Sequence, residues 1–130
     1  MHAFAEYTTS PWESVNPIPD DIDTRFAVAS IVQGLTALTF ATEAYDIKKG
    51  DWVLIHTVAG GFGLFLTQVA HARGARIIGT TSSQEKAAIA KDFGADHVII
   101  YTEENTVDKV LEYTGGAGVN VIYDGVGKDT

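Results

Sequence analysis

The chain has 130 residues, 45% of them hydrophobic and 20% charged, a composition that suits one globular domain and excludes a disordered chain. Nine basic against seventeen acidic side chains give a formal net charge of −8, which disfavours nucleic-acid binding because acidic surfaces repel phosphate. The lack of cysteine excludes disulfides, thiol catalysis and cysteine zinc sites, and it suits a reducing compartment, so we expect a cytoplasmic protein.

The first 22 residues differ in character from the rest of the chain. They hold all three prolines, within turn-forming and extended sequences. Asp23 or Thr24 can then cap a helix that continues to about Ala44. Apolar residues surround this predicted helix, so we expect burial on more than one side. They are Phe26, Val28, Ile31, Val32, Leu35, Leu38 and Phe40.

The 21 residues from Trp52 to Ala72 include no Asp, Glu, Lys or Arg, a length that alone suggests a membrane span. Gly60, Gly61 and Gly63 interrupt the centre of this stretch. Because clustered glycines are unfavourable inside a helix, we predict a strand, a glycine turn and a helix instead. We therefore expect no membrane segment.

From Trp52 onward, short β-branched runs alternate with helical sequences. We predict strands at 52–56, 76–80, 97–101 and 120–124, and helices at 61–73, from Ser82 or Ser83 to Gly94, and at 103–113. This alternation is typical of parallel βαβ units with helices on both faces of the sheet. The predicted fold is α/β, a partial Rossmann fold (a doubly wound parallel sheet) with strand order 3-2-1-4 and a long N-terminal helix.

A complete fold of this type has six strands, so we expect strands 5 and 6 to be absent. The fourth strand would then be an exposed edge of the sheet. Because unpaired strand edges pair readily with other chains, we expect self-association through this edge.

The turn after the first predicted strand carries the strongest functional signal. In Val58-Ala-Gly-Gly-Phe-Gly63, Gly60 and Gly63 match the second and third glycines of G-x-G-x-x-G. In dinucleotide-binding folds the second glycine lets main-chain N–H groups approach a pyrophosphate, and the third lets the helix pack closely on the strand. A purely structural turn is the alternative, and the strand and helix predicted around it favour a cofactor site.

The end of the second predicted strand indicates which nucleotide is bound. Chains that bind NAD have an acidic residue about 20 positions after the turn, which holds a ribose hydroxyl. Here Thr81 occupies that region, two serines follow it, and Lys86 lies one helical turn further on. No carboxylate occupies that place, where an acid would repel the 2′-phosphate of NADP, so we predict NADPH as the cofactor. Alternatively, the serines only cap the helix and Lys86 is a solvated side chain.

Five segments together resemble one protein family. They are Gln33 to Ala37, the 59–63 turn, and residues 94–99, 114–116 and 123–130. On these segments the chain resembles the cofactor domain of the medium-chain dehydrogenase/reductase superfamily, specifically its NADPH-dependent quinone oxidoreductases, the zeta-crystallin group. The resemblance implies that residues 1–22 are a remnant of a GroES-like catalytic domain and its linker. Residues 23–130 would be the N-terminal part of the NADP-binding Rossmann domain.

The resemblance also implies a set of cofactor-binding residues. Gly60, Gly61, Phe62 and Gly63 would line the pyrophosphate. Lys86 would meet the 2′-phosphate, with Ser82 as a further donor. Tyr101 would lie beside the adenosine, Thr36 near the nicotinamide amide, and Val126 against the adenine.

Zinc alcohol dehydrogenases of the superfamily have a cysteine ligand where this chain has Gln33, so the resemblance implies the zinc-free branch and no metal site. The implied reaction is hydride transfer from NADPH to a quinone, an enal or another activated carbonyl. No catalytic side chain is identified in this sequence. We expect the chain alone to be inactive, because the substrate cleft of the family lies between this domain and the catalytic domain.

Two positions depart from the family pattern, and two other functions stay open. Val58 replaces the usual alanine, so a β-branched side chain must fit a tight turn, and Gly125 replaces the usual serine. One alternative is a non-catalytic nucleotide- or RNA-binding module of the zeta-crystallin type. The negative net charge disfavours its RNA-binding role. The other is a methyltransferase with a similar glycine turn, which the missing acid at Thr81 disfavours.

Overall fold

In the computed structural model, which describes residues 4–128, the four strands form one parallel sheet. They are β1 (Trp52–Ile55), β2 (Arg76–Thr81), β3 (His97–Ile100) and β4 (Val121–Tyr123), in the order β3-β2-β1-β4. In the central strand, Ile55 lies opposite Gly79 of β2 and Tyr123 of β4. The predicted partial Rossmann fold is confirmed, with each strand end within one residue of its expected position.

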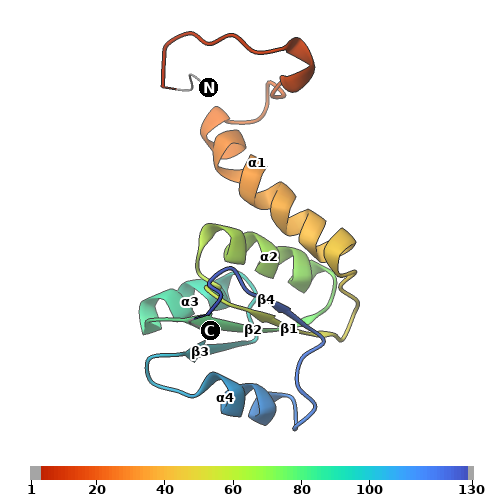
Figure 1. The fold of residues 1–130 in the computed structure, drawn as a ribbon, viewed down its shortest axis with the longest axis vertical. Coiled ribbons are helices and arrows are strands. Elements are labelled where there is room, and N and C mark those ends of the chain that lie inside the picture. Colours follow the sequence, from red (N-terminus) through yellow and green to blue (C-terminus); the bar gives the residue numbers. More distant parts are fainter. Residues whose placement is uncertain (1–3, 129–130) are drawn as a thin grey trace.

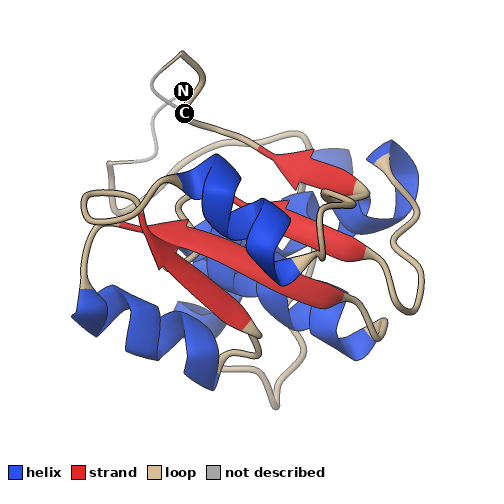
Figure 2. Ribbon diagram, turned by 90° about the horizontal axis from the view of Figure 1, so that it is seen from below, coloured by secondary structure: helices blue, strands red, loops and turns tan. Residues whose placement is uncertain are grey.

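Helices cover both faces of this sheet (Figures 1 and 2). Helices α2 (Gly61–Ala72) and α3 (Gln84–Asp92) lie on one face, and α4 (Thr106–Tyr113) lies on the other. Because side chains alternate along a strand, Ile55 packs towards α2 while its neighbour Leu54 packs towards Val110 of α4. Both faces of β1 are therefore buried, as its uninterrupted apolar sequence predicts.

Side chains set the first residues of α3 and α4. The Ser83 hydroxyl accepts a hydrogen bond from the Lys86 N–H at 3.4 Å, so Ser83 caps α3 and Ser82 does not. The predicted start of the last helix at 103 was wrong, because α4 begins at Thr106. Asn105 caps it by accepting from the Asp108 N–H at 3.1 Å, and the Glu104 carboxylate accepts from the Ile100 N–H at 3.3 Å. Glu104 therefore closes a turn after β3 rather than opening the helix.

Helix α1 (Thr24–Thr39) begins at Asp23, whose side chain accepts from two main-chain N–H groups, and it ends in a π-helical turn, η2 (Phe40–Ala44). The prediction that α1 is buried on more than one side was wrong. Only Ala37 of α1 is buried, and the seven apolar residues expected inside are between 42% and 71% exposed. The physical reason is visible in Figure 1, where α1 extends away from the sheet beyond its contact with α2.

Among the described residues, the stretch Thr24–Ala44 is long and apolar enough to cross a membrane, with a mean hydropathy of 1.3. Only 11% of its most apolar window is buried. Core helices of soluble proteins and signal sequences near an N-terminus meet the same criterion, so length and composition do not separate these cases. Part of α1 packs on α2, with Phe65 close to Gly34. The expectation of no membrane segment stays a prediction. The run 52–72, by contrast, folds as strand, turn and helix.

Residues 4–22 are exposed throughout and contain one short 3₁₀ helix, η1 (Trp12–Ser14). Their assignment to the remnant of a catalytic domain stays a prediction.

A buried tyrosine joins β4 to the end of α1. The Tyr123 hydroxyl donates to the Phe40 carbonyl at 2.9 Å, and the two rings stack with centroids 6.3 Å apart. The same carbonyl accepts the Tyr45 N–H at 3.2 Å, the bond that closes the π-helical turn. Burial raises the pKa of the Tyr123 hydroxyl above its ordinary value, and the nearby Tyr45 adds to this effect. The neutral hydroxyl is therefore part of the connection between the sheet and α1.

Raising the pH should destabilise the protein by ionising Tyr123. A raised pKa in the folded state gives stability that is fully present below the unfolded pKa of about 10 and is lost as the pH rises through the folded pKa. We expect Tyr123→Phe to lower the free energy of unfolding by about 1 kcal/mol at neutral pH and to reduce its fall at alkaline pH. Urea unfolding at about pH 8 and pH 11 measures both effects.

Tyr7→Phe is the matched control, because Tyr7 is fully solvated at 90% exposure and should change neither quantity. An alkaline loss of stability that is equally large in wild type and Tyr123→Phe would contradict this role for the Tyr123 hydroxyl.

Candidate functional site

Main-chain hydrogen bonds bring three segments together at the carboxyl edge of the sheet. The Val58 N–H donates to the Thr80 carbonyl at 3.0 Å, and the Tyr101 N–H donates to the Thr81 carbonyl at 3.1 Å. The turn after β1, the end of β2 and the residue after β3 therefore lie next to one another. In open α/β sheets, this edge near the central strand is where ligands bind.

The glycine turn leaves the start of α2 open to a ligand. Gly60 precedes α2 without a side-chain cap, and the first N–H groups of a helix have no partner within the helix. A Cβ atom at Gly63 would lie 2.6 Å from the carbonyl oxygens of both Thr57 and Val58, so only glycine fits there. The close packing predicted for the third glycine is confirmed. The free N–H groups and the helix dipole make this turn suitable for an anion.

The start of α3, which follows the end of β2, carries a hydroxyl and an ammonium group. Since Ser83 caps the helix, the half-buried Ser82 hydroxyl is left without a hydrogen bond to any described residue. Lys86 lies in the first turn of α3, is exposed, and forms no ion pair within residues 4–128. A positive charge at a helix N-terminus opposes the helix dipole, so α3 itself gains nothing from Lys86. An anionic ligand would compensate this charge.

Tyr101 stands at the rim of a cavity of about 1000 Å³ between the sheet and α4. The Nδ1 atom of His56 lies 3.0 Å from the Thr80 hydroxyl, and both residues line this cavity together with Val126. Sequence reasoning missed His56 and Thr80 as site residues. Their position could have indicated them, because both are polar residues at the carboxyl ends of neighbouring parallel strands.

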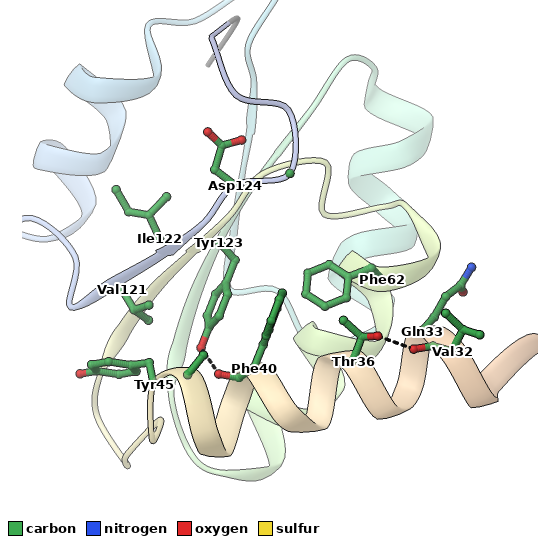
Figure 3. A pocket seen from close by; sticks show the side chains of 12 residues that line it. Val32, Gln33, Thr36, Phe40, Tyr45, Phe62, Val121, Ile122, Tyr123 and Asp124 are labelled. Atoms are coloured by element: carbon green, nitrogen blue, oxygen red, sulfur yellow. Dashed lines mark hydrogen bonds between the residues drawn. The ribbon is translucent and has the colours of Figure 1, made fainter. Parts of the chain in front are cut away.

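Thr36 lies apart from Lys86 and Tyr101, in a second cavity of about 630 Å³ between α1, α2 and β4 (Figure 3). Its hydroxyl donates to the Val32 carbonyl of the same helix at 2.6 Å. The Phe62 ring points into this cavity and meets the Phe40 ring edge to face at 5.6 Å. Phe62 therefore connects the two regions, with its main chain in the turn and its side chain in the second cavity.

Aromatic and polar groups share the wall of this second cavity. Burial and the Asp51 carboxylate, whose oxygen lies 3.2 Å from the hydroxyl, raise the pKa of Tyr45. Gly125 also lines the cavity, and a Cβ atom there would meet nothing within 4 Å among the described residues. Packing therefore does not require a glycine at this position. The Gln33 side chain lies directly against Gly61 and is a further site residue whose place the sequence did not reveal.

No group of three or more His, Cys, Asp or Glu side chains that could hold a metal ion lies within the described part of the chain. His56, His71 and His97, the histidines within residues 4–128, are thus not gathered with acidic residues into a coordination sphere.

The chain has close relatives among known proteins. It is 42% identical over 130 residues to a quinone oxidoreductase of Pseudomonas aeruginosa, a match that covers 100% of this chain and 40% of that protein. It is 38% identical over 132 residues to a 2-haloacrylate reductase of Burkholderia, covering 100% of this chain and 40% of that one. The crystal structure of Escherichia coli quinone oxidoreductase complexed with NADPH is similar with a TM-score of 0.85 at 43% identity, over 87% of this chain and 35% of that chain.

The chain thus spans about two fifths of the length of the curated relatives that it matches. The family described as zinc-binding dehydrogenase matches residues 61–130, which is more than half of the chain. The chain therefore belongs to the zinc-binding dehydrogenase family of the medium-chain dehydrogenase/reductase superfamily, and the predicted resemblance to its quinone oxidoreductases is confirmed.

Proposed function

We propose that this chain is the NADPH-binding portion of a zinc-free quinone oxidoreductase, which transfers hydride from NADPH to quinones, enals or other activated carbonyls. One observation carries the proposal: the turn that leads to the uncapped start of α2, with a glycine required at 63, bonds to the end of β2, the strand that leads into α3 and its exposed Lys86. The relatives named quinone oxidoreductase and the NADPH complex of the Escherichia coli enzyme support it.

The described residues fit the parts of such a nucleotide. The N–H groups of Gly61, Phe62 and Gly63 are suited to the pyrophosphate, because it can accept all the hydrogen bonds that α2 leaves unused. Lys86 and Ser82 would bind the 2′-phosphate. This site has a cation and a hydroxyl, which can bind a dianion; the Glu85 carboxylate, exposed in the same first turn of α3, is the one negative group next to them.

Tyr101 would border the adenosine within the larger cavity, and Thr36 would contact the nicotinamide amide in the smaller one. The Thr36 hydroxyl already donates its proton to Val32, so its oxygen is available as an acceptor for the amide N–H₂ group. Bound NADPH supplies the hydride, while the protein supplies position and the exclusion of water.

Zinc does not fit the described residues, despite the name of the family, because no suitable group of ligands is gathered among them. We therefore assign no step to a metal. Since the chain spans about two fifths of its relatives, hydride transfer is proposed for the whole protein and nucleotide binding for this chain. The proposal includes a cytoplasmic location, in keeping with the lack of cysteine, and no role in nucleic-acid binding, in keeping with the charge of −8.

The 2′-phosphate should determine which adenine nucleotide binds. We expect the chain to bind 2′,5′-ADP more tightly than 5′-AMP, because only the former can reach Lys86 with a second phosphate. Lys86→Gln should weaken 2′,5′-ADP binding about tenfold and leave 5′-AMP binding unchanged. Isothermal titration calorimetry measures both affinities.

Lys91→Gln is the matched control for this titration, because Lys91 is also exposed and lies at the other end of α3. Equal affinity of the wild type for the two nucleotides would overturn the choice of NADPH. A preference that survives in Lys86→Gln would remove Lys86 from the site.

Self-association through β4 is the second part of the proposal. Within residues 4–128, β4 pairs only with β1, and Ile122 is 55% exposed on this edge. We expect sedimentation equilibrium to show a mass that rises with protein concentration, and Ile122→Lys to suppress this rise because a charge on an edge strand opposes pairing. Ile89→Lys on α3, where the side chain is 40% exposed, is the control and should have no effect. A monomer mass at every concentration would refute the idea.

A further inference from the structure

The turn between β1 and α2 has an unfavourable backbone conformation. Thr57 has a φ of +55°, and it is the one residue other than glycine with a positive φ in the described part of the chain. β-Branched residues rarely adopt this conformation, because their side chains crowd the backbone. Contacts from the surroundings must therefore hold the turn in place, and such strained residues often occur at ligand sites.

One such contact is made by Val58, a β-branched residue. Its side chain is completely buried and lies over Gly79 in the middle of β2. A Cβ atom at position 79 would come within 2.5 Å of Val58 Cγ1, 2.6 Å of its Cβ and 2.7 Å of its Cγ2. The space that Gly79 leaves empty is therefore occupied by the Val58 side chain.

Gly79 is needed for space and not for backbone conformation. Its φ is not among the positive values found in this structure, and it pairs regularly with Ile55 of β1 and Val98 of β3. Glycine inside a strand weakens the strand and usually marks the close approach of another segment. The segment that approaches here is the turn at Val58.

The other side of Val58 supports α2. A Cβ atom added at Gly63 would lie only 2.6 Å from the Val58 carbonyl oxygen. The Val58 N–H donates to the Thr80 carbonyl at 3.0 Å. Val58 thus lies between the backbone of β2 and the first turn of α2, with a glycine on each side. The thickness of this one side chain sets how far the start of α2 lies from β2.

We infer that Val58 is a positioning residue for the nucleotide: seated over Gly79, it holds the strained turn so that the free N–H groups of α2 point at the pyrophosphate. This inference rests on the proposed function, because it concerns the same anion site. A smaller residue at 58 would leave an unfilled space over Gly79, and the start of α2 could then settle towards β2 or Thr57 could leave its positive φ. An alanine at 79 would restore part of the lost volume.

The test compares two ligands in three variants. NADPH carries a pyrophosphate that reaches the turn, whereas adenosine 2′-monophosphate has no 5′-phosphate and would contact only the Lys86 side of the site. We expect Val58→Ala to weaken NADPH binding about tenfold and to leave binding of adenosine 2′-monophosphate unchanged. The double variant Val58→Ala with Gly79→Ala should recover most of the lost NADPH affinity. Calorimetry at a temperature where circular dichroism shows every variant folded measures these affinities.

Gly79→Ala alone should bind NADPH more weakly than wild type, or fail to fold, because its methyl group overlaps the Val58 side chain. Either result supports the pairing, and wild-type affinity in this variant opposes it. Val69→Ala, which removes the same atoms from a partly buried site on α2 away from the turn, is the control and should lower the melting temperature without changing the ratio of the two affinities.

The outcomes separate the inference from the proposed function. If wild type binds neither ligand, the proposed function fails. If wild type binds both and Val58→Ala weakens both equally or neither, the positioning role of Val58 is wrong while the nucleotide site stands. Absence of recovery in the double variant would show that Val58 does not act through Gly79.

Discussion

The close approach of β1, β2 and α2 at Val58 is the constraint on which the candidate site depends. Gly63 lets the first turn of α2 rest on the Thr57 and Val58 carbonyls, and Gly79 lets Val58 rest on β2. Without either glycine the N-terminus of α2 would be pushed away from the sheet. The N–H groups of that helix are useful to a ligand only because they are held at the carboxyl edge, beside the ends of β2 and β3.

This local arrangement explains how a chain with a net charge of −8 can offer a site for phosphate. Charges more than about 10 Å apart are largely screened in physiological salt, so the total charge mainly affects long-range encounters. At short range, in the site that we propose, the ligand would meet main-chain N–H groups, a hydroxyl at Ser82 and the ammonium group of Lys86. The overall charge therefore argues against extended polyanions such as RNA more strongly than against one nucleotide.

The sequence predicted those parts of the fold that depend on local pattern. Apolar β-branched runs located all four strands, and glycine spacing located the turn and the start of α2. The start of α4 was misplaced because Glu104, a residue suited to a helix N-terminus, bonds back to Ile100 instead. The burial of α1 was wrong for a different reason: apolar residues show that a helix surface can be buried, and they do not identify what covers it.

In the candidate site, too, the sequence predicted local features and missed contacts between distant segments. The roles expected of Gly60 and Gly63 follow from backbone geometry within six residues, whereas the contacts of Gln33, His56 and Thr80 join segments that are distant in sequence. Gly79 shows most clearly how a contact between distant segments escapes the sequence. A glycine inside a strand only weakens it when the strand is considered alone. Its purpose is seen only with Val58, which lies 21 positions earlier and fills the space above it. A large side chain at one position is thus matched by the lack of a side chain at another, and this pairing is a property of the folded chain.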